Sequence, residues 1–323
     1  MVAALILAAG VSLTENATVA IDSISRIEII KRLIMVFRQA SIRRIVVLTG
    51  HDAEEIENRC SHLGVVFIRN AENKNGNMLS DIKIGLTYLK GKCEKVFISP
   101  ADVSLFSAET VIKLGNSQAQ AAIPIYNDRS GYPLLIVQDI FDRIIGCEGA
   151  EDIDEALSVG EIKRQDIEVP DAGVKIDVSD NADMEAIVHY HSLRKIRPEA
   201  KIQLMAERGF FGPGIMLLLT LIKETGSLKH AAKRMGLSQN KAIRMIAVAE
   251  EQLGYEILAT SRGGYHGNGT VGGGSSEITK KGMDLMNSYE AFEFECTEYI
   301  KRSFEKHFSG INEDYEGQTD KQT

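Results

Sequence analysis

The residues that open the chain are of types that bind phosphate. An apolar run ends in a small glycine loop formed by Ala8, Ala9, Gly10 and Ser12. A strand that turns in this way presents backbone N–H groups to an anion. The segment Val11–Val19 that continues the loop contains no lysine or arginine to neutralise phosphate charge. We therefore expect a nucleotide to bind at Ala8, Ala9, Gly10 and Ser12 without efficient turnover.

A second group of informative residues lies near the other end of the chain. Gly226–Ser238, followed by Gln239–Leu253, has the layout of two helices joined by a short turn at Gly236, which is typical of a helix-turn-helix. Ser238 is placed to cap the second helix. The alternative is a surface helix with a solvated charged face.

The charge of this segment favours DNA as its partner. Between Lys223 and Ala249 there are six basic residues and one acidic residue, a local net charge of +5 in a chain of net charge −8. Ile243, Ile246 and Val248 are expected to face the core. The side chains expected to contact base edges and phosphates in a major groove are Lys229, Lys233, Ser238, Gln239, Asn240, Lys241, Arg244 and Arg262.

The elements that must position these residues fall into two domains. Strand and helix patterns alternate over about the first 190 residues, which predicts an α/β fold with a Rossmann-like, mainly parallel sheet and helices on both faces. The expected strands are Ala3–Ala8, Arg44–Thr49, Val65–Ile68, Lys95–Ser99, Ala121–Tyr126, Tyr132–Val137 and Val174–Val178. The expected helices are Ser25–Ala40, one from Asp52, Asn77–Leu89 and Asn181–Arg194.

The predicted parts are a domain over 1–195, a linker over 196–204 around Pro198, a helix-rich domain over 205–308, and a disordered acidic tail over 309–323.

Composition limits the classes of protein that fit. The chain of 323 residues is 44% hydrophobic and 25% charged, which is ordinary for a globular protein. Its cysteines, Cys60, Cys93, Cys147 and Cys296, are widely spaced, so neither a disulfide framework nor a zinc site is expected. The absence of a long apolar run or a leader pattern predicts no membrane span and a cytoplasmic location.

The C-terminal segment resembles the DNA-binding domain of molybdate-responsive (ModE-like) repressors. The residues that carry the resemblance are Phe210–Gly214, Gly226–Ala232, the glycine-rich stretch Arg262–Gly274, and Ile278–Gly282. The resemblance covers Met205–Phe308. It implies a winged helix-turn-helix with Arg262 in the wing, and a double-stranded DNA operator as partner.

The same resemblance implies that the last helix pairs two subunits into a homodimer. Met283–Phe308 carries an apolar stripe consisting of Leu285, Tyr289, Phe292, Cys296, Tyr299 and Phe304. The alternative is that this stripe packs on its own domain.

The N-terminal segment resembles the molybdenum-cofactor nucleotidyltransferases (MobA-like). The fragments that carry the resemblance occur in the family's order: Leu7–Ser12, Asn77–Leu86, Pro100–Val103, Gly131–Ile136 and Ile176–Asp183. The resemblance implies a bound nucleotide or pterin, and Mg²⁺ held by Asp102 and Asp177. The alternative for Asp102 is a loop carboxylate that caps the next helix.

Five positions depart from the pattern of that family. Thr14 and Val19 stand where the resemblance places an arginine and a lysine, and Asn16 stands where it places a glycine. Tyr132 replaces a histidine, and Asp81 replaces a serine. Because preorganised donors of this kind stabilise a phosphoryl transition state by about 3 kcal/mol each, efficient nucleotidyl transfer is not expected.

Three functions follow from these observations. The first is a transcription regulator linked to molybdenum or its cofactor, with the degenerate nucleotidyltransferase-like domain as sensor of a small-molecule effector. The second is an enzyme that transfers a nucleotide from CTP or GTP to molybdopterin, with an appended DNA-binding domain. The third is a scaffold that binds a molybdoenzyme apoprotein without DNA or catalysis.

Overall fold

The computed structural model describes residues 1–9, 26–50, 52–70, 77–103, 105–175, 198, 200–261 and 275–308. The chain divides into two compact units, Met1–Arg194 and Lys195–Thr323. Several expected features lie outside the described residues: Gly10, Ser12, Asp177, Arg262, the helix Asn181–Arg194 and the tail 309–323.

The first unit contains an eight-stranded sheet. The strands are β1 (Val2–Ala8), β2 (Arg44–Thr49), β3 (Val66–Arg69), β4 (Lys95–Pro100), β5 (Ala121–Tyr126), β6 (Arg129–Ser130), β7 (Leu134–Val137) and β8 (Arg164–Glu168). Their order is β3-β2-β1-β4-β7-β5-β6, with β8 paired to β5. β1 runs parallel to β2 and β4, β2 is parallel to β3, and β7 lies antiparallel between β4 and β5. The expectation of a Rossmann-like, mainly parallel sheet is confirmed.

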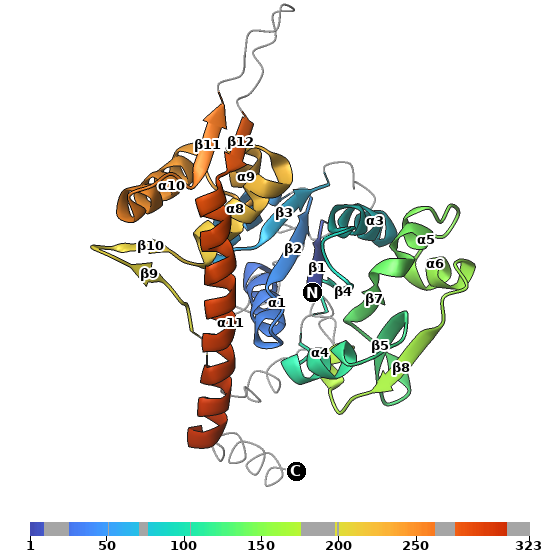
Figure 1. Cartoon of the computed structure of the whole chain (residues 1–323). Helices are drawn as coiled ribbons and strands as arrows, with labels where there is room; N and C mark the ends of the chain where they lie inside the picture. Colours follow the sequence, from blue (N-terminus) through green and yellow to red (C-terminus); the bar gives the residue numbers. More distant parts are fainter. Residues whose placement is uncertain are drawn as a thin grey trace, which may run out of the picture. The chain divides into compact units, whose positions relative to one another are not determined.

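Helices cover both faces of this sheet (Figure 1). They are α1 (Arg26–Gln39), α2 (Ala53–Cys60), α3 (Met78–Leu89), α4 (Ala108–Gly115), α5 (Phe141–Ile145) and α6 (Ile153–Val159). Apolar residues of α1, α2 and α4 share a core with Ala4, Ile6 and Ala8 of β1. Leu5 faces the other side, where a Cβ on Gly85 of α3 would lie 2.3 Å from its Cδ2. Because side chains alternate along a strand, β1 packs against both layers.

The prediction of a late strand at Val174–Val178 is wrong for Val174 and Lys175, the two residues of that range that the structure describes. Ala172–Val174 forms a 3-10 helix, because the Asp171 carboxylate accepts a hydrogen bond of 3.0 Å from the Gly173 N–H and so begins a turn. Residues 176–178 lie outside the described part of the chain.

The second unit combines helices with two hairpins. Its elements are β9 (Leu204–Met205), β10 (Gly209–Phe211), α8 (Pro213–Thr225), α9 (Leu228–Arg234), α10 (Gln239–Leu253), β11 (Leu258–Ser261), β12 (Ser275–Ile278) and α11 (Lys280–Phe308). Leu218, Leu221 and Ile222 of α8 lie in its core with Ile246 of α10. Among the described residues, no helix has the length and apolarity needed to cross a membrane.

Candidate nucleic-acid interface and ligand site

The carboxyl edge of the sheet begins where β1 and β2 end. Ala8 pairs with Thr49 in register, and Ala8 and Ala9 are both buried. A Cβ on Gly50 would lie 2.3 Å from the carbonyl oxygen of Ala9, so only glycine allows the two backbones to approach this closely. Two of the four expected nucleotide-binding residues, Ala8 and Ala9, therefore lie at this edge.

Asp102 lies at the same edge, beside the end of β1. Leu7 pairs with Pro100, and the Ala101 N–H donates a hydrogen bond of 3.0 Å to the Leu7 carbonyl. The Asp102 side chain is half-buried. It does not cap the next helix, because Ser107 does so by accepting a hydrogen bond of 3.2 Å from the Thr110 N–H. The capping alternative for Asp102 is therefore wrong.

Tyr132 is a neutral hydrogen-bond donor near Asp102. Its hydroxyl donates to the Met78 sulfur at 3.8 Å, at the first residue of α3. Burial, followed by the negative charges of Asp154, Asp102 and Asp152, raises the pKa of Tyr132 to about 12. The phenol is consequently protonated at neutral pH, and these carboxylates lie close enough to act on it.

Asn70 and Asp81 form a buried polar pair at this edge, just after β3. Sequence reasoning did not predict that these two residues would meet. The Asn70 N–H donates to the Thr49 carbonyl at 2.8 Å, and its side-chain amide donates to the Asp81 carboxylate at 2.8 Å. Both side chains are buried. Asn77 caps the adjacent N-terminus of α3 by accepting a hydrogen bond of 3.0 Å from the Ser80 N–H. Asp81 thus holds α3 against the end of β3.

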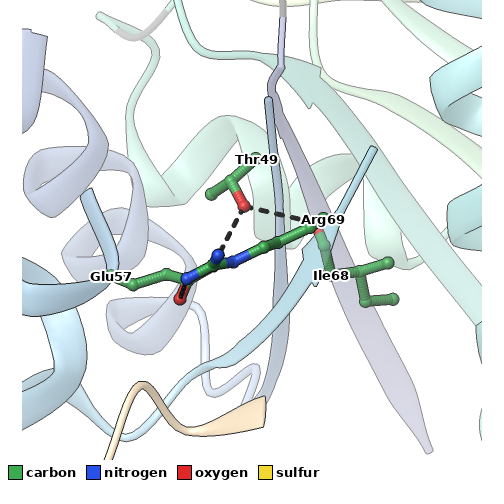
Figure 2. A network of polar contacts seen from close by, with 4 residues as sticks. All are labelled: Thr49, Glu57, Ile68 and Arg69. Atoms are coloured by element: carbon green, nitrogen blue, oxygen red, sulfur yellow. Dashed lines mark hydrogen bonds and ion pairs between the residues drawn. The ribbon is translucent and has the colours of Figure 1, made fainter. Parts of the chain in front are cut away.

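A second network, also missed by sequence reasoning, lies at the ends of β2 and β3. Figure 2 shows the Arg69 guanidinium against the Glu57 carboxylate, with Thr49 beside them. The Thr49 hydroxyl also donates a hydrogen bond to the Ile68 carbonyl. The hydrogen bonds from Arg69 to Glu57 raise the pKa of the guanidinium. Because Glu57 is buried and belongs to α2, this contact ties α2 to β3.

The described residues offer part of the expected metal site. They include Asp102 but not Asp177. Within the described ranges, no group of three or more histidine, cysteine, aspartate or glutamate side chains could hold a metal ion.

The helix-turn-helix is built by two capped helices around a glycine turn. Ser227 caps α9 by accepting from the His230 N–H at 3.4 Å, and Ser238 caps α10 by accepting from the Lys241 N–H at 3.2 Å. Gly236 in the turn has a φ of +64°, a conformation that favours glycine. The small side chains of Ala231 and Ala232 in α9 are buried. This geometry confirms the predicted pair of helices.

The outer surface of this pair is polar and basic. Apart from Arg262, which is not described, the expected DNA contacts are all exposed: Lys229, Lys233, Ser238, Gln239, Asn240, Lys241 and Arg244. The side-chain oxygen of Ser238 also serves the helix cap. Exposed cations and long amides on two adjoining helices can contact phosphates and base edges.

Two of the three core residues expected in α10 lie elsewhere. Ile246 is buried, but Val248 is half-buried and Ile243 is exposed. The buried face consists of Ala242, Ile246 and Ala249, at positions i, i+4 and i+7. Ile243 follows Ala242 and is turned by about 100° from it, so it lies off the buried face.

The hairpin after α10 occupies the position of a wing. β11 and β12 pair antiparallel, with Leu258 opposite Ile278 and Ser261 opposite Ser275. The Ser276 N–H donates to the Gly226 carbonyl at 2.8 Å, which ties β12 to the turn between α8 and α9. The stretch Arg262–Gly274 lies outside the described residues.

The first half of α11 packs on its own unit. Tyr289 is buried, meets the Phe211 ring edge-on at a centroid distance of 5.1 Å, and donates to the Ile202 carbonyl at 2.8 Å. Farther along the expected stripe, Phe292 and Tyr299 are exposed. The alternative, that the stripe packs on its own domain, therefore holds for Tyr289. Dimerisation through the rest of the stripe stays a prediction.

Comparison with known families explains this combination of units. Residues 216–266 match the family described as bacterial regulatory helix-turn-helix protein, lysR family. The second unit therefore carries a helix-turn-helix DNA-binding domain of the LysR type, and the expectation of a ModE-like domain is wrong. Most of the glycine-rich stretch Arg262–Gly274, which suggested that family, lies beyond the end of this match. No curated protein sequence matches the chain.

Several solved structures resemble part of the chain in fold. A Mycobacterium tuberculosis H37Rv protein, solved as a manganese complex, is 16% identical with a TM-score of 0.46, and the match covers 58% of this chain and 98% of that one. A Methanothermobacter nucleotidyl transferase is 16% identical with a TM-score of 0.49, covering 60% and 99%. The 4-diphosphocytidyl-2C-methyl-D-erythritol synthase of Anaerococcus prevotii is 15% identical with a TM-score of 0.47, covering 59% and 95%.

The first unit, with its mainly parallel sheet, is matched by a second family description. Residues 4–165 match the MobA-like NTP transferase domain, and this span is half of the chain. The match runs from β1 into β8 and includes Ala8, Ala9, Asp81 and Asp102. The chain therefore belongs to the MobA-like NTP transferase domain family, and in it that domain is fused to a helix-turn-helix.

Proposed function

We propose that this chain is a DNA-binding transcription regulator whose NTP-transferase unit acts as the sensor of a small ligand. The observation that carries the proposal is the exposed row of cations and amides on α9 and α10 of a helix-turn-helix. The local net charge of +5 between Lys223 and Ala249 contrasts with −8 for the whole chain. A basic face on two adjoining helices is suited to a DNA groove and its phosphates.

The ligand that we propose is a nucleotide or a pterin, with Mg²⁺ as counter-ion. The membership of residues 4–165 in an NTP transferase family supports this class of ligand. Ala8, Ala9 and Asp102 gather at the carboxyl edge of the sheet, where ligands bind in open α/β folds. Asp102, with Asp177, would hold the metal. The lack of a basic residue in Val11–Val19 favours binding over turnover.

We further propose a homodimer and a link to molybdenum-cofactor metabolism. The exposed Phe292, Phe294 and Tyr299 on α11 support a helix-to-helix contact between two copies. Two-fold symmetry of the protein would match two half-sites in the operator. The link to the cofactor rests on the sequence resemblance of the first unit.

The test is fluorescence anisotropy of the purified chain on a duplex from its own upstream region. Binding is measured over a salt series, with and without Mg-nucleotide, and against a scrambled duplex. The proposal expects tighter binding to the upstream duplex, a steep dependence on salt, and a shift when Mg-nucleotide is added. Equal binding to the scrambled duplex at every salt concentration would count against a regulator of its own upstream region.

Nucleotidyl transfer to a pterin is the second candidate, because family membership and the position of Asp102 favour it. It predicts Mg²⁺-dependent release of pyrophosphate from CTP or GTP in the presence of molybdopterin. The Asp102→Ala variant would abolish that release if Asp102 holds the metal. Release of pyrophosphate by the wild-type chain and not by this variant would show that the first unit is an enzyme, and the proposal of a sensor would be dropped.

A further inference from the structure

Ile243 is a large apolar side chain on α10 that lies off the buried face of that helix. It is 46% exposed, whereas Ala242, which precedes it, and Ile246, three positions after it, are buried. Single exposed apolar residues are common on protein surfaces, so the exposure by itself indicates nothing. The neighbours of Ile243 on the helix make it informative.

Ile243 lies within a strip of exposed side chains along α10. Gln239 lies one turn before it, Asn240 three positions before it, and Ala247 one turn after it, and all three are exposed. Residues three and four apart share a helix face. Gln239, Asn240, Ile243 and Ala247 therefore form one strip, called the α10 strip below. Its polar members can form hydrogen bonds with bases, whereas Ile243 presents only hydrocarbon.

The helix that carries this strip is held at both ends. At its N-terminus, the Ser238 hydroxyl accepts a hydrogen bond of 3.2 Å from the Lys241 N–H. Near its C-terminus, the Glu250 carboxylate accepts from the N–H groups of Ile257 and Leu258 at 2.8 Å and 3.1 Å. The cap satisfies a backbone N–H at the start of α10, and Glu250 ties the last turns of the helix to the start of β11.

We propose that Ile243 is a specificity-determining residue that reads thymine by packing against its C5-methyl group in the major groove. This inference rests on the proposed DNA-binding function. Thymine presents a methyl group in that groove, and apolar side chains contact it. The exposed cations Lys241 and Arg244 flank the strip, so a polyanion fits this surface better than a second copy of the chain. The branched side chain of Ile243 has few rotamers to lose on binding.

The test begins with selection of preferred duplexes from a random library by the wild-type chain and by Ile243→Ala. Each thymine in the selected site is then replaced, one at a time, by deoxyuridine, which lacks the methyl group. In each half-site, one of these single replacements should weaken binding by the wild-type chain about four-fold, as expected for the loss of one buried methyl group. For Ile243→Ala, the same replacement should have no effect, because the contact is already missing.

Two controls identify the cause. Ile112→Ala removes an isoleucine of similar exposure, 45%, from α4 of the first unit and should leave the thymine dependence intact. Arg244→Ala should weaken binding to both duplexes while the ratio between thymine and deoxyuridine is kept. Unaltered melting of Ile243→Ala would show that the variant folds.

Three outcomes would overturn the inference. In the first, the wild-type chain binds a selected duplex, and every thymine replacement has the same effect on binding by the wild-type chain and by Ile243→Ala. Ile243 then reads no methyl group, and the proposed function stands. If Ile243→Ala instead changes the oligomeric state with unchanged thymine dependence, Ile243 contacts another copy of the chain. If the wild-type chain selects no duplex at all, the proposed function and this inference both fail.

Discussion

Arg69 and Glu57 form a two-point contact at the carboxyl edge of the sheet. The Arg69 Nε lies 2.7 Å from Glu57 Oε1, and Nη2 lies 2.6 Å from Oε2 (Figure 2). The two side chains differ in exposure, because the Arg69 side chain is 40% exposed whereas that of Glu57 is buried. Glu57 therefore depends on Arg69 for its charge balance, while Arg69 can still be solvated by water.

This asymmetry predicts unequal costs of removing the two partners. Arg69→Ala leaves a buried carboxylate without its guanidinium and should destabilise the first unit by about 3 kcal/mol. Glu57→Ala leaves a guanidinium that water can reach and should cost less. Differential scanning calorimetry of the full chain measures both, with Arg59→Ala, which removes the exposed partner of Glu55, as control. An equal loss from both variants would contradict the dependence of Glu57 on Arg69.

Tyr132 predicts a loss of stability at alkaline pH. Its pKa is raised to about 12 by burial and by the nearby Asp154, Asp102 and Asp152. When the folded-state pKa lies above the unfolded value, the unfolded chain loses its proton first as the pH rises. The free energy of unfolding should therefore fall as the pH rises from the ordinary tyrosine pKa of about 10 towards 12.

The Tyr132→Phe variant isolates this contribution. It keeps the ring and removes the ionisable hydroxyl, so its free energy of unfolding should fall less steeply in that pH range. Urea denaturation at a series of alkaline pH values measures the difference between the two chains. Parallel curves for the wild-type chain and the variant would show that the Tyr132 hydroxyl ionises equally well in the folded state.

The sheet could be predicted from sequence because its strands are continuous apolar runs. Arg44–Thr49 and Ala121–Tyr126 form strands with the expected bounds, and both runs end at residues that favour turns, Gly50 and Asn127. Ala8, Ala9 and Asp102 lie at one edge because parallel β1 and β4 both end there. Asp102 was singled out by the resemblance to the MobA-like family, and its role as a metal ligand stays a prediction.

The rest required contacts that no local pattern contains. Glu57 and Arg69 are twelve positions apart and meet only after α2 folds back onto β3. The phase of α10 was mistaken because Ala242 and Ile243 are both apolar, and periodicity by itself does not decide which of them faces inward. Packing against α8 and α9 decides it, since the small Ala242 permits a close approach that a branched side chain would prevent.

The thiols of the chain should differ sharply in reactivity. Cys60, Cys93 and Cys147 are buried, whereas Cys296 on α11 is half-buried. Burial raises the pKa of Cys93 to about 11, so little of its reactive thiolate forms at about pH 8. Ellman's reagent should modify Cys296 first in the folded chain and all four thiols after denaturation. Cys296→Ser should remove the fast phase, and a fast phase that persists in this variant would place another thiol at the surface.

The cations of the helix-turn-helix predict a change in the salt dependence of DNA binding. Lys241 and Arg244 are exposed at the start of α10, where phosphate contacts are expected. Each phosphate contact removed should reduce the slope of log affinity against log salt concentration by about 1. Lys241→Ala and Arg244→Ala should therefore bind more weakly with flatter slopes in fluorescence anisotropy, while Lys163→Ala, an exposed lysine of the first unit, should match the wild-type chain. Unchanged slopes in both α10 variants would remove these side chains from the interface, because a cation that meets a phosphate must release counter-ions when it binds.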